Sequence, residues 1–98
     1  MSKHEQLRVR VQEMAEIGGY EHIYYTWSSR HSPAGFPDML FLKDGKLIVA
    51  ELKIRPDNLR AEQYFWLMEF LTITDEVYVW DDSDQDWEQI QSVFWRPR

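Results

Sequence analysis

Two apolar runs joined by a tight turn lie in the middle of this sequence and constrain its fold more than any other feature. Residues 39–53 read MLFLKDGKLIVAELK. Asp44-Gly45 supplies the positive φ angles that a two-residue connection needs, so the pattern predicts a β-hairpin. Its first strand starts beside Pro37-Asp38 and runs to Leu42, and its second strand covers residues 47–53. The second strand is apolar at consecutive positions, which allows burial on both of its faces.

Helices are expected on either side of this hairpin. Leu7, Val11, Met14 and Ala15 have helical spacing and predict a helix over residues 3–17, which ends at Gly18-Gly19. We predict four further elements: a strand over 22–27, a loop over 28–35, a helix over 59–71 and a strand over 76–80. A last helix over 84–94 would begin with an acidic cap. The order α-β-β-β-α-β-α predicts an α/β fold in which helices flank a small mixed sheet, with residues 1–98 in one domain.

Length and composition limit the classes of protein to which the chain can belong. With 98 residues, 44% of them hydrophobic, it has room for one modest core and does not resemble a disordered chain. Cysteine is absent, and the three histidines lack the spacing of a zinc site, so any metal would bind oxygen ligands. No run is long and apolar enough for a membrane span or a signal peptide. We therefore expect no membrane partner and a cytoplasmic location, in the host cell if a phage encodes the chain.

The net charge of −6 argues against a nucleic-acid partner, because proteins that bind phosphates usually carry a basic surface. The charge is unevenly distributed along the chain. Residues 72–90 contain seven acids and no Lys or Arg, whereas residues 1–71 have nine bases and ten acids. This polarity is compatible with a phosphate-facing side and a separate acidic side.

Three ionisable residues converge on the predicted hairpin. Asp38 stands at the head of the first strand, and Glu51 and Lys53 lie two apart on the second, so these two side chains share a face. A carboxylate on so apolar a strand needs a cation or a close partner. Mg²⁺, for which Mn²⁺ can substitute, takes one or two carboxylates together with water and phosphate oxygens. We expect Asp38, Glu51 and the backbone carbonyl of Leu52 to bind this ion.

A Glu-x-Lys pair taken alone is most often an ordinary surface or salt-bridge pair. Here it belongs to a longer pattern, with GFPD at residues 35–38, ELK at 51–53 and QxxW at 63–66. Chance agreement with so long a pattern is improbable.

With these motifs the sequence resembles the virus-type replication-repair nuclease domain of the PD-(D/E)xK superfamily over nearly its whole length. The resemblance implies a restriction-endonuclease-like core of order α-β-β-β-α-β and magnesium-dependent hydrolysis of DNA. It also implies that Asp38 and Glu51 bind the metal, that Lys53 activates or positions the attacking water, and that Gln63 supports the site. Glu5 of the first helix would complete the site, although a solvated acid at the start of a helix is an equal alternative.

The sequence departs from the family between Lys53 and Gln63. The family usually has a Gly followed by Ser or Thr before the second helix, whereas this chain has Asp57-Asn58 and Arg60. Because Asn58 can adopt a left-handed conformation and can also cap a helix, we expect the turn to be preserved.

Basic and aromatic side chains near the motifs are candidates for contacts with DNA. The basic candidates are Arg30, His31, Arg55 and Arg60. Arg30 and His31 could hold a phosphate next to the scissile one, and an exposed pair without a role is the alternative. Tyr24, Tyr25 and Trp27 could stack on bases, but aromatic residues on a strand more often belong to a core.

The function expected from these observations is a metal-dependent endonuclease that acts on branched DNA. Stand-alone members of the family resemble Holliday-junction resolvases, so we expect a homodimer that binds a four-way junction. The alternatives are a nicking or flap-type nuclease and, in a different class, an inactive nuclease fold that only binds DNA. We also expect Asp38→Asn and Glu51→Gln to abolish cleavage without loss of stability, because each relieves repulsion between like charges.

Overall fold

The fold is built on one four-stranded sheet with the strand order β1-β2-β3-β4. The computed structural model describes residues 1–27 and 30–95. The strands are β1 (His22–Tyr25), β2 (Met39–Lys43), β3 (Lys46–Leu52) and β4 (Val77–Trp80). The pairs β1–β2 and β2–β3 are antiparallel and β3–β4 is parallel, so the predicted mixed sheet is confirmed. The predicted turn is confirmed too, since Asp44 and Gly45 have φ angles of 50° and 78°.

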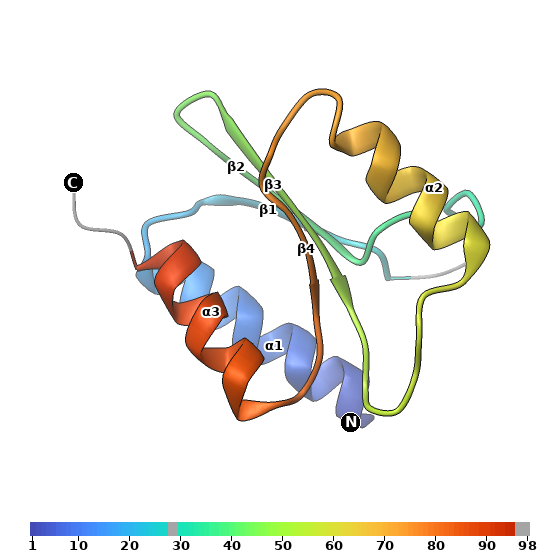
Figure 1. Cartoon of the computed structure of the whole chain (residues 1–98). Coiled ribbons are helices and arrows are strands. Elements are labelled where there is room, and N and C mark those ends of the chain that lie inside the picture. Colours follow the sequence, from blue (N-terminus) through green and yellow to red (C-terminus); the bar gives the residue numbers. More distant parts are fainter. Residues whose placement is uncertain (28–29, 96–98) are drawn as a thin grey trace.

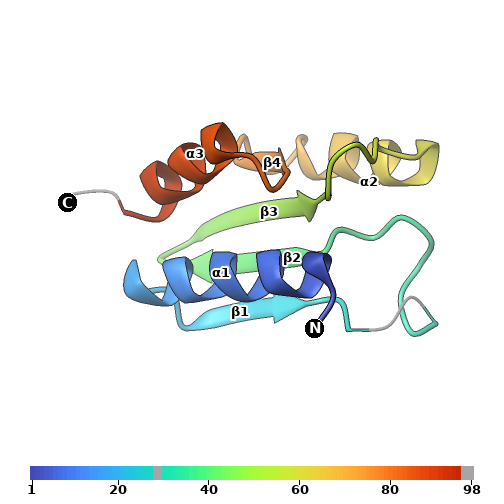
Figure 2. The same cartoon turned by 90° about the horizontal axis from the view of Figure 1, so that it is seen from below.

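Three helices cover the two faces of the sheet unequally. The helices are α1 (Lys3–Ile17), α2 (Ala61–Phe70) and α3 (Asp84–Phe94), which completes the predicted order of elements. Figure 1 shows α1 and α3 side by side on one face and α2 on the other. Figure 2, seen from below, shows α1 running along the strands. The chain is therefore an α/β sandwich with two helices on one side of the sheet and a single short helix on the opposite side.

The main core lies between the sheet and the helix pair. Its buried members on the sheet include Met39, Phe41, Ile48, Leu52 and Trp80. The helices contribute Leu7, Val11 and Ala15 from α1 and Ile90, Val93 and Phe94 from α3. The predicted helical stripe of the first segment is thus the face of α1 that packs on the sheet.

Strand β3 is buried on both faces, as its sequence predicted. Residues Ile48, Val49, Ala50, Glu51 and Leu52 are all buried. Ile48, Ala50 and Leu52 point into the main core, so Val49 and Glu51 point to the opposite face, which α2 covers. The internal position of β3 therefore forces one carboxylate into the space under α2.

Several local predictions are wrong in detail. The cap of α3 is Ser83, whose hydroxyl accepts a hydrogen bond from the Asp86 amide, and Asp84 belongs to the first turn. Asn58 neither caps α2 nor has a positive φ angle, because α2 begins after Arg60. Tyr24, Tyr25 and Trp27 are exposed rather than part of a core, since β1 is an edge strand and Trp27 lies beyond its end. Of the predicted loop, Ser28 and Ser29 lie outside the described residues.

Among the described residues, no helix has the length and apolar character needed to cross a membrane.

Candidate active site

Asp38 is fixed between α1 and the end of β3. It lies just before β2, where its backbone carbonyl accepts a hydrogen bond of 2.8 Å from the Thr26 amide. Its carboxylate oxygen Oδ2 accepts a hydrogen bond of 2.8 Å from the backbone N–H of Leu52. The same oxygen lies 3.3 Å from Nε2 of His4. Three segments distant in sequence therefore determine the position of this carboxylate.

Glu51 is a buried carboxylate, with only 3% of its surface exposed. The side-chain amide of Gln63 donates a hydrogen bond of 2.8 Å to its oxygen Oε2, and the ammonium of Lys53 lies 3.6 Å from that oxygen. Gln63 is held in turn, because its own carbonyl oxygen accepts a hydrogen bond of 2.9 Å from the Arg60 amide at the start of α2. The structure thus brings Glu51, Lys53 and Gln63 together.

The two carboxyl groups differ in their electrostatic surroundings. Burial and the nearby charge of Asp38 raise the pKa of Glu51 to about 7, and Lys53 opposes this shift only in part. Burial also acts to raise the pKa of Asp38, but the hydrogen bonds from His4 and Leu52 outweigh it and lower that pKa. The hydrogen bond to Asp38 raises the pKa of His4. At neutral pH Asp38 is therefore charged, whereas Glu51 is close to its titration midpoint.

The two carboxylates line a cleft of about 370 Å³ between the loop before β2 and the start of α2. Gln63, Arg60, Phe36 and Trp27 also line it. A larger hollow of about 680 Å³ lies beside the β2–β3 hairpin. The smaller cleft is the better candidate for chemistry because it contains the buried carboxylate and its polar partners.

The loop that forms one wall of the cleft packs tightly on α2. The indole N–H of Trp66 donates a hydrogen bond of 3.1 Å to the carbonyl of Ala34, and Phe36 makes an edge-to-face contact with Trp66 at 5.1 Å. Gly35 has a φ angle of +84°, and a Cβ atom there would lie 2.6 Å from the carbonyl oxygen of Glu62. Only glycine fits this position, because both the backbone conformation and the close approach exclude a side chain. The GFPD and QxxW motifs are thus two halves of one contact.

The side chains at the site fit a divalent ion in part. Among the described residues, no group of three or more acidic or histidine side chains is placed to hold a metal ion. Mg²⁺ needs fewer, since it is commonly bound through one or two carboxylates and keeps several waters. Asp38 and Glu51 meet that minimum. Burial, and then the nearby charge of Asp38, raise the pKa of Glu51, and a cation bound between the two carboxylates would oppose both effects. The site thus offers two carboxylates to a divalent ion.

Helix α1 contributes a different residue from the one that the resemblance implied. Glu5 is exposed and accepts a hydrogen bond from the hydroxyl of Ser2, which caps the helix. His4 instead contacts Asp38. A signal for His4 was present in the sequence, since it lies three residues before Leu7 and so continues the core stripe of the helix.

The four basic candidates for DNA contacts are in unequal settings. Arg60 lines the cleft. Arg30 is exposed in the neighbouring loop, and the ring of His31 stacks on Trp27 at a centroid distance of 4.6 Å. Arg55 forms an ion pair with Asp82, in which Nε and Oδ1 are 3.0 Å apart. Arg55 is therefore engaged with the acidic segment rather than directed at the cleft.

Comparison with models of protein families, with the sequences of curated proteins and with solved structures finds no match to this chain.

The unequal surroundings of the two carboxylates predict opposite effects on stability in metal-free protein. A raised folded-state pKa means that the stability contributed by Glu51 is present below about pH 4.5 and is lost as the pH rises through about 7. The free energy of unfolding of Glu51→Gln, relative to that of the native chain, should therefore rise by on the order of 2 kcal/mol as the pH increases from about 5 to about 8. The lowered pKa of Asp38 contributes stability above about pH 3.8. Asp38→Asn should therefore be less stable at neutral pH, which corrects the expectation from the sequence that this substitution causes no loss of stability. Urea unfolding in excess chelator measures both differences, and a gain in both variants would show that repulsion is shared equally.

Gly35→Ala should destabilise the protein more than Gly45→Ala does. Both glycines have positive φ angles, but a Cβ at Gly45 meets no atom within 4 Å. A Cβ at Gly35 would lie 2.7 Å from the backbone nitrogen of Gln63. Gly45→Ala thus measures the conformational cost alone, about 1 kcal/mol. The additional loss in Gly35→Ala, expected to be about 1 to 3 kcal/mol, reports the displaced start of α2. Chemical denaturation of both variants provides the comparison, and equal losses would mean that the loop and α2 are not in close contact.

Proposed function

We propose that this chain is a metal-dependent DNA endonuclease and belongs to the virus-type replication-repair nuclease family that its motifs resemble. The observation that supports this most is the geometry around Glu51. A buried carboxylate lies beside a second carboxylate and a lysine at a cleft, with Lys53 Nζ 3.6 Å from Glu51 Oε2. Such a cluster attracts a divalent cation and a phosphate, which are the two components of metal-assisted phosphodiester hydrolysis.

Each residue has a separate task in this proposal. Asp38 and Glu51 would hold the ion, which would supply a lowered pKa for a water and positive charge beside the phosphate oxygens. The ammonium of Lys53 donates hydrogen bonds to the attacking water or to the phosphate as negative charge develops. Gln63 keeps Glu51 in place through its amide, and its position depends on the backbone of Arg60. Arg60 lies at the cleft, where its charge can attract a neighbouring phosphate.

We further propose that the substrate is branched DNA and that the protein acts as a homodimer on a four-way junction. A dimer with twofold symmetry presents two equivalent sites to a junction of similar symmetry. An exposed apolar surface supports such an assembly. It includes Tyr24, Leu42 and Val79, which lie on the face of the sheet that α2 covers only in part, together with Met68 of α2 and Leu71 just after its end. Exposed apolar surface of this kind is typical of protein interfaces.

Cleavage of a labelled branched duplex should require Mg²⁺ or Mn²⁺ and should stop in excess chelator. Asp38→Asn and Glu51→Gln should each lower the rate at least about a hundredfold, because each removes one of two metal ligands. Glu69→Gln is the matched control, since Glu69 is an exposed acid on α2. Cutting that persists in chelator, or full activity in either site variant, would reject the proposed active site.

Light scattering at micromolar concentration should give the mass of a dimer for the free protein and for its complex with a four-way junction. Leu42→Lys should weaken the dimer, because it places a charge in an apolar interface, while the helix-covered core remains intact. The side chain of Leu42 is about half exposed, so the substitution should have little effect on folding. Circular dichroism can check this. A protein that stays monomeric on the junction would favour the nicking or flap-type alternative.

A further inference from the structure

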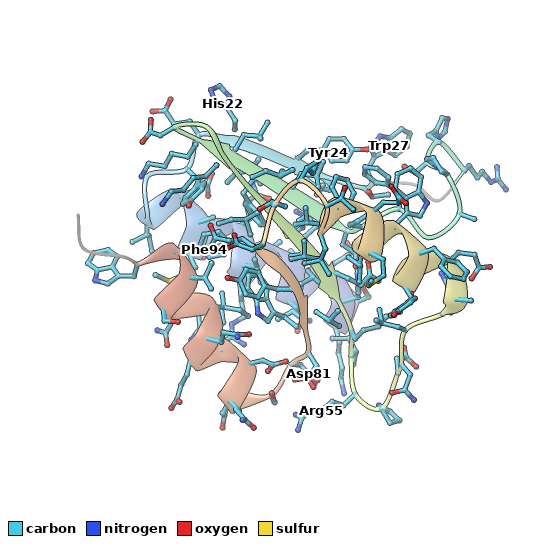
Figure 3. All side chains as sticks on the ribbon, turned by 45° about the horizontal axis from the view of Figure 1, so that its top comes forward. His22, Tyr24, Trp27, Arg55, Asp81 and Phe94 are labelled. Atoms are coloured by element: carbon cyan, nitrogen blue, oxygen red, sulfur yellow. The ribbon has the colours of Figure 1, made fainter. Side chains whose placement is uncertain are left out.

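Trp27 is the most exposed tryptophan among the described residues, with 68% of its surface accessible. It lies two residues beyond the end of β1, and the preceding Thr26 is hydrogen-bonded to the segment just before β2 that carries Asp38. The Thr26 amide donates to the Asp38 carbonyl and its hydroxyl donates to the Pro37 carbonyl, both at 2.8 Å. Figure 3 shows Trp27 beyond Tyr24, far from Arg55 and Asp81. The indole is therefore positioned by the same backbone that positions Asp38.

The surroundings of Trp27 distinguish it from the other exposed aromatic residues of β1. The Tyr25 ring packs beneath the guanidinium of Arg8, at 4.0 Å, and the Tyr24 ring contacts Phe36 edge to face. Trp27 instead stacks on the ring of His31, with an angle of 23° between the planes, and lines the cleft that contains Asp38 and Glu51. The lining of the cleft thus includes an aromatic platform as well as the two carboxylates.

The size of the cleft limits what the platform can contact. A volume of about 370 Å³ is near the lower end of the range for pockets that hold small molecules. Bases inside a duplex are stacked on both sides, so an indole beside the scissile phosphate can stack only on a base that has left the helix. Every base has a π face, so this contact would be tolerant of sequence.

We propose that Trp27 stacks on an unpaired base next to the scissile phosphate, so that the substrate is a DNA strand with an unstacked nucleotide at the branch. This inference rests on the proposed nuclease function. It makes the proposed substrate more specific, because an unpaired base is required where the strand enters the cleft. Such a base occurs at a flap, a gap or the centre of an opened junction. Arg60 also lines the cleft, and its guanidinium would contact the phosphate of the same nucleotide.

The test uses a branched duplex that carries the fluorescent base aminopurine as its single unpaired nucleotide, with Ca²⁺ in place of Mg²⁺. Binding of the native protein should quench the probe, because stacking on an indole quenches its emission. Trp27→Leu should abolish the quenching and weaken binding about tenfold, a change that corresponds to about 1.4 kcal/mol. Trp27→Phe should restore part of both. Trp95→Leu is the matched control, since Trp95 is 62% exposed at the end of α3, and Figure 1 shows α3 on the face of the sheet opposite to α2.

Cleavage of the same branch with Mg²⁺ separates the inference from the function on which it rests. The native protein should cut the branch with an unpaired nucleotide faster than a fully paired duplex, and Trp27→Leu should lose most of this preference. If Trp27→Leu binds, quenches and cuts as the native protein does, or if Trp95→Leu is equally impaired, the stacking role is wrong and the nuclease function stands. If the native protein binds and quenches but never cuts, the nuclease function fails and the stacking site remains. An absence of binding and quenching by the native protein also rejects the stacking role.

Discussion

The burial of Glu51 is the constraint on which the rest of the site depends. An internal strand of a sheet covered on both sides leaves this carboxylate 3% exposed, and a buried charge must be compensated. The chain provides a hydrogen bond from Gln63 and the charge of Lys53, yet the pKa of Glu51 still rises to about 7. The compensation is therefore incomplete in the metal-free protein. A buried carboxylate whose negative charge is only partly compensated is poorly suited to a purely structural role and well suited to binding a cation.

The unequal layers of the fold explain how so small a chain can maintain such a site. Helices α1 and α3 pack a continuous core against one face of the sheet, and this core contains most of the fully buried apolar side chains. On the opposite face, the only helix among the described residues is the short helix α2. It is held there in part by specific contacts, from Gln63 to Glu51 and from Trp66 to the loop carbonyl of Ala34. Stability thus resides mainly on one side of the sheet, which leaves the other side available for polar groups and for the cleft.

The sequence predicted the elements and the centre of the site because both follow from short-range periodicity. The two-residue spacing of Glu51 and Lys53 placed them on one face, and the Asp-Gly turn brought Asp38 beside them. Contacts that depend on how a helix is rotated and packed on the sheet could not be predicted from the sequence. The contact of His4 with Asp38 depends on how α1 packs on the sheet, and the start of α2 after Arg60 depends on the Gln63 side chain, which accepts a hydrogen bond from the Arg60 backbone amide. The exposure of Tyr24 follows from the edge position of β1, which local sequence does not reveal.

The distribution of charge bears on the objection that an acidic protein is a poor partner for DNA. The acids of residues 72–90 flank β4 or lie on α3, and one of them, Asp82, is paired with Arg55. Thr26 and Trp27, which follow β1, line the cleft, and β1 and β4 are opposite edges of the sheet. The affinity that phosphate contacts contribute grows with the number of Lys and Arg side chains that make them. The wall of the cleft offers Arg60 rather than a row of basic side chains. Under the proposed function, discrimination would then depend on the stacking of one open base more than on charge, which suits an enzyme that must ignore intact duplex.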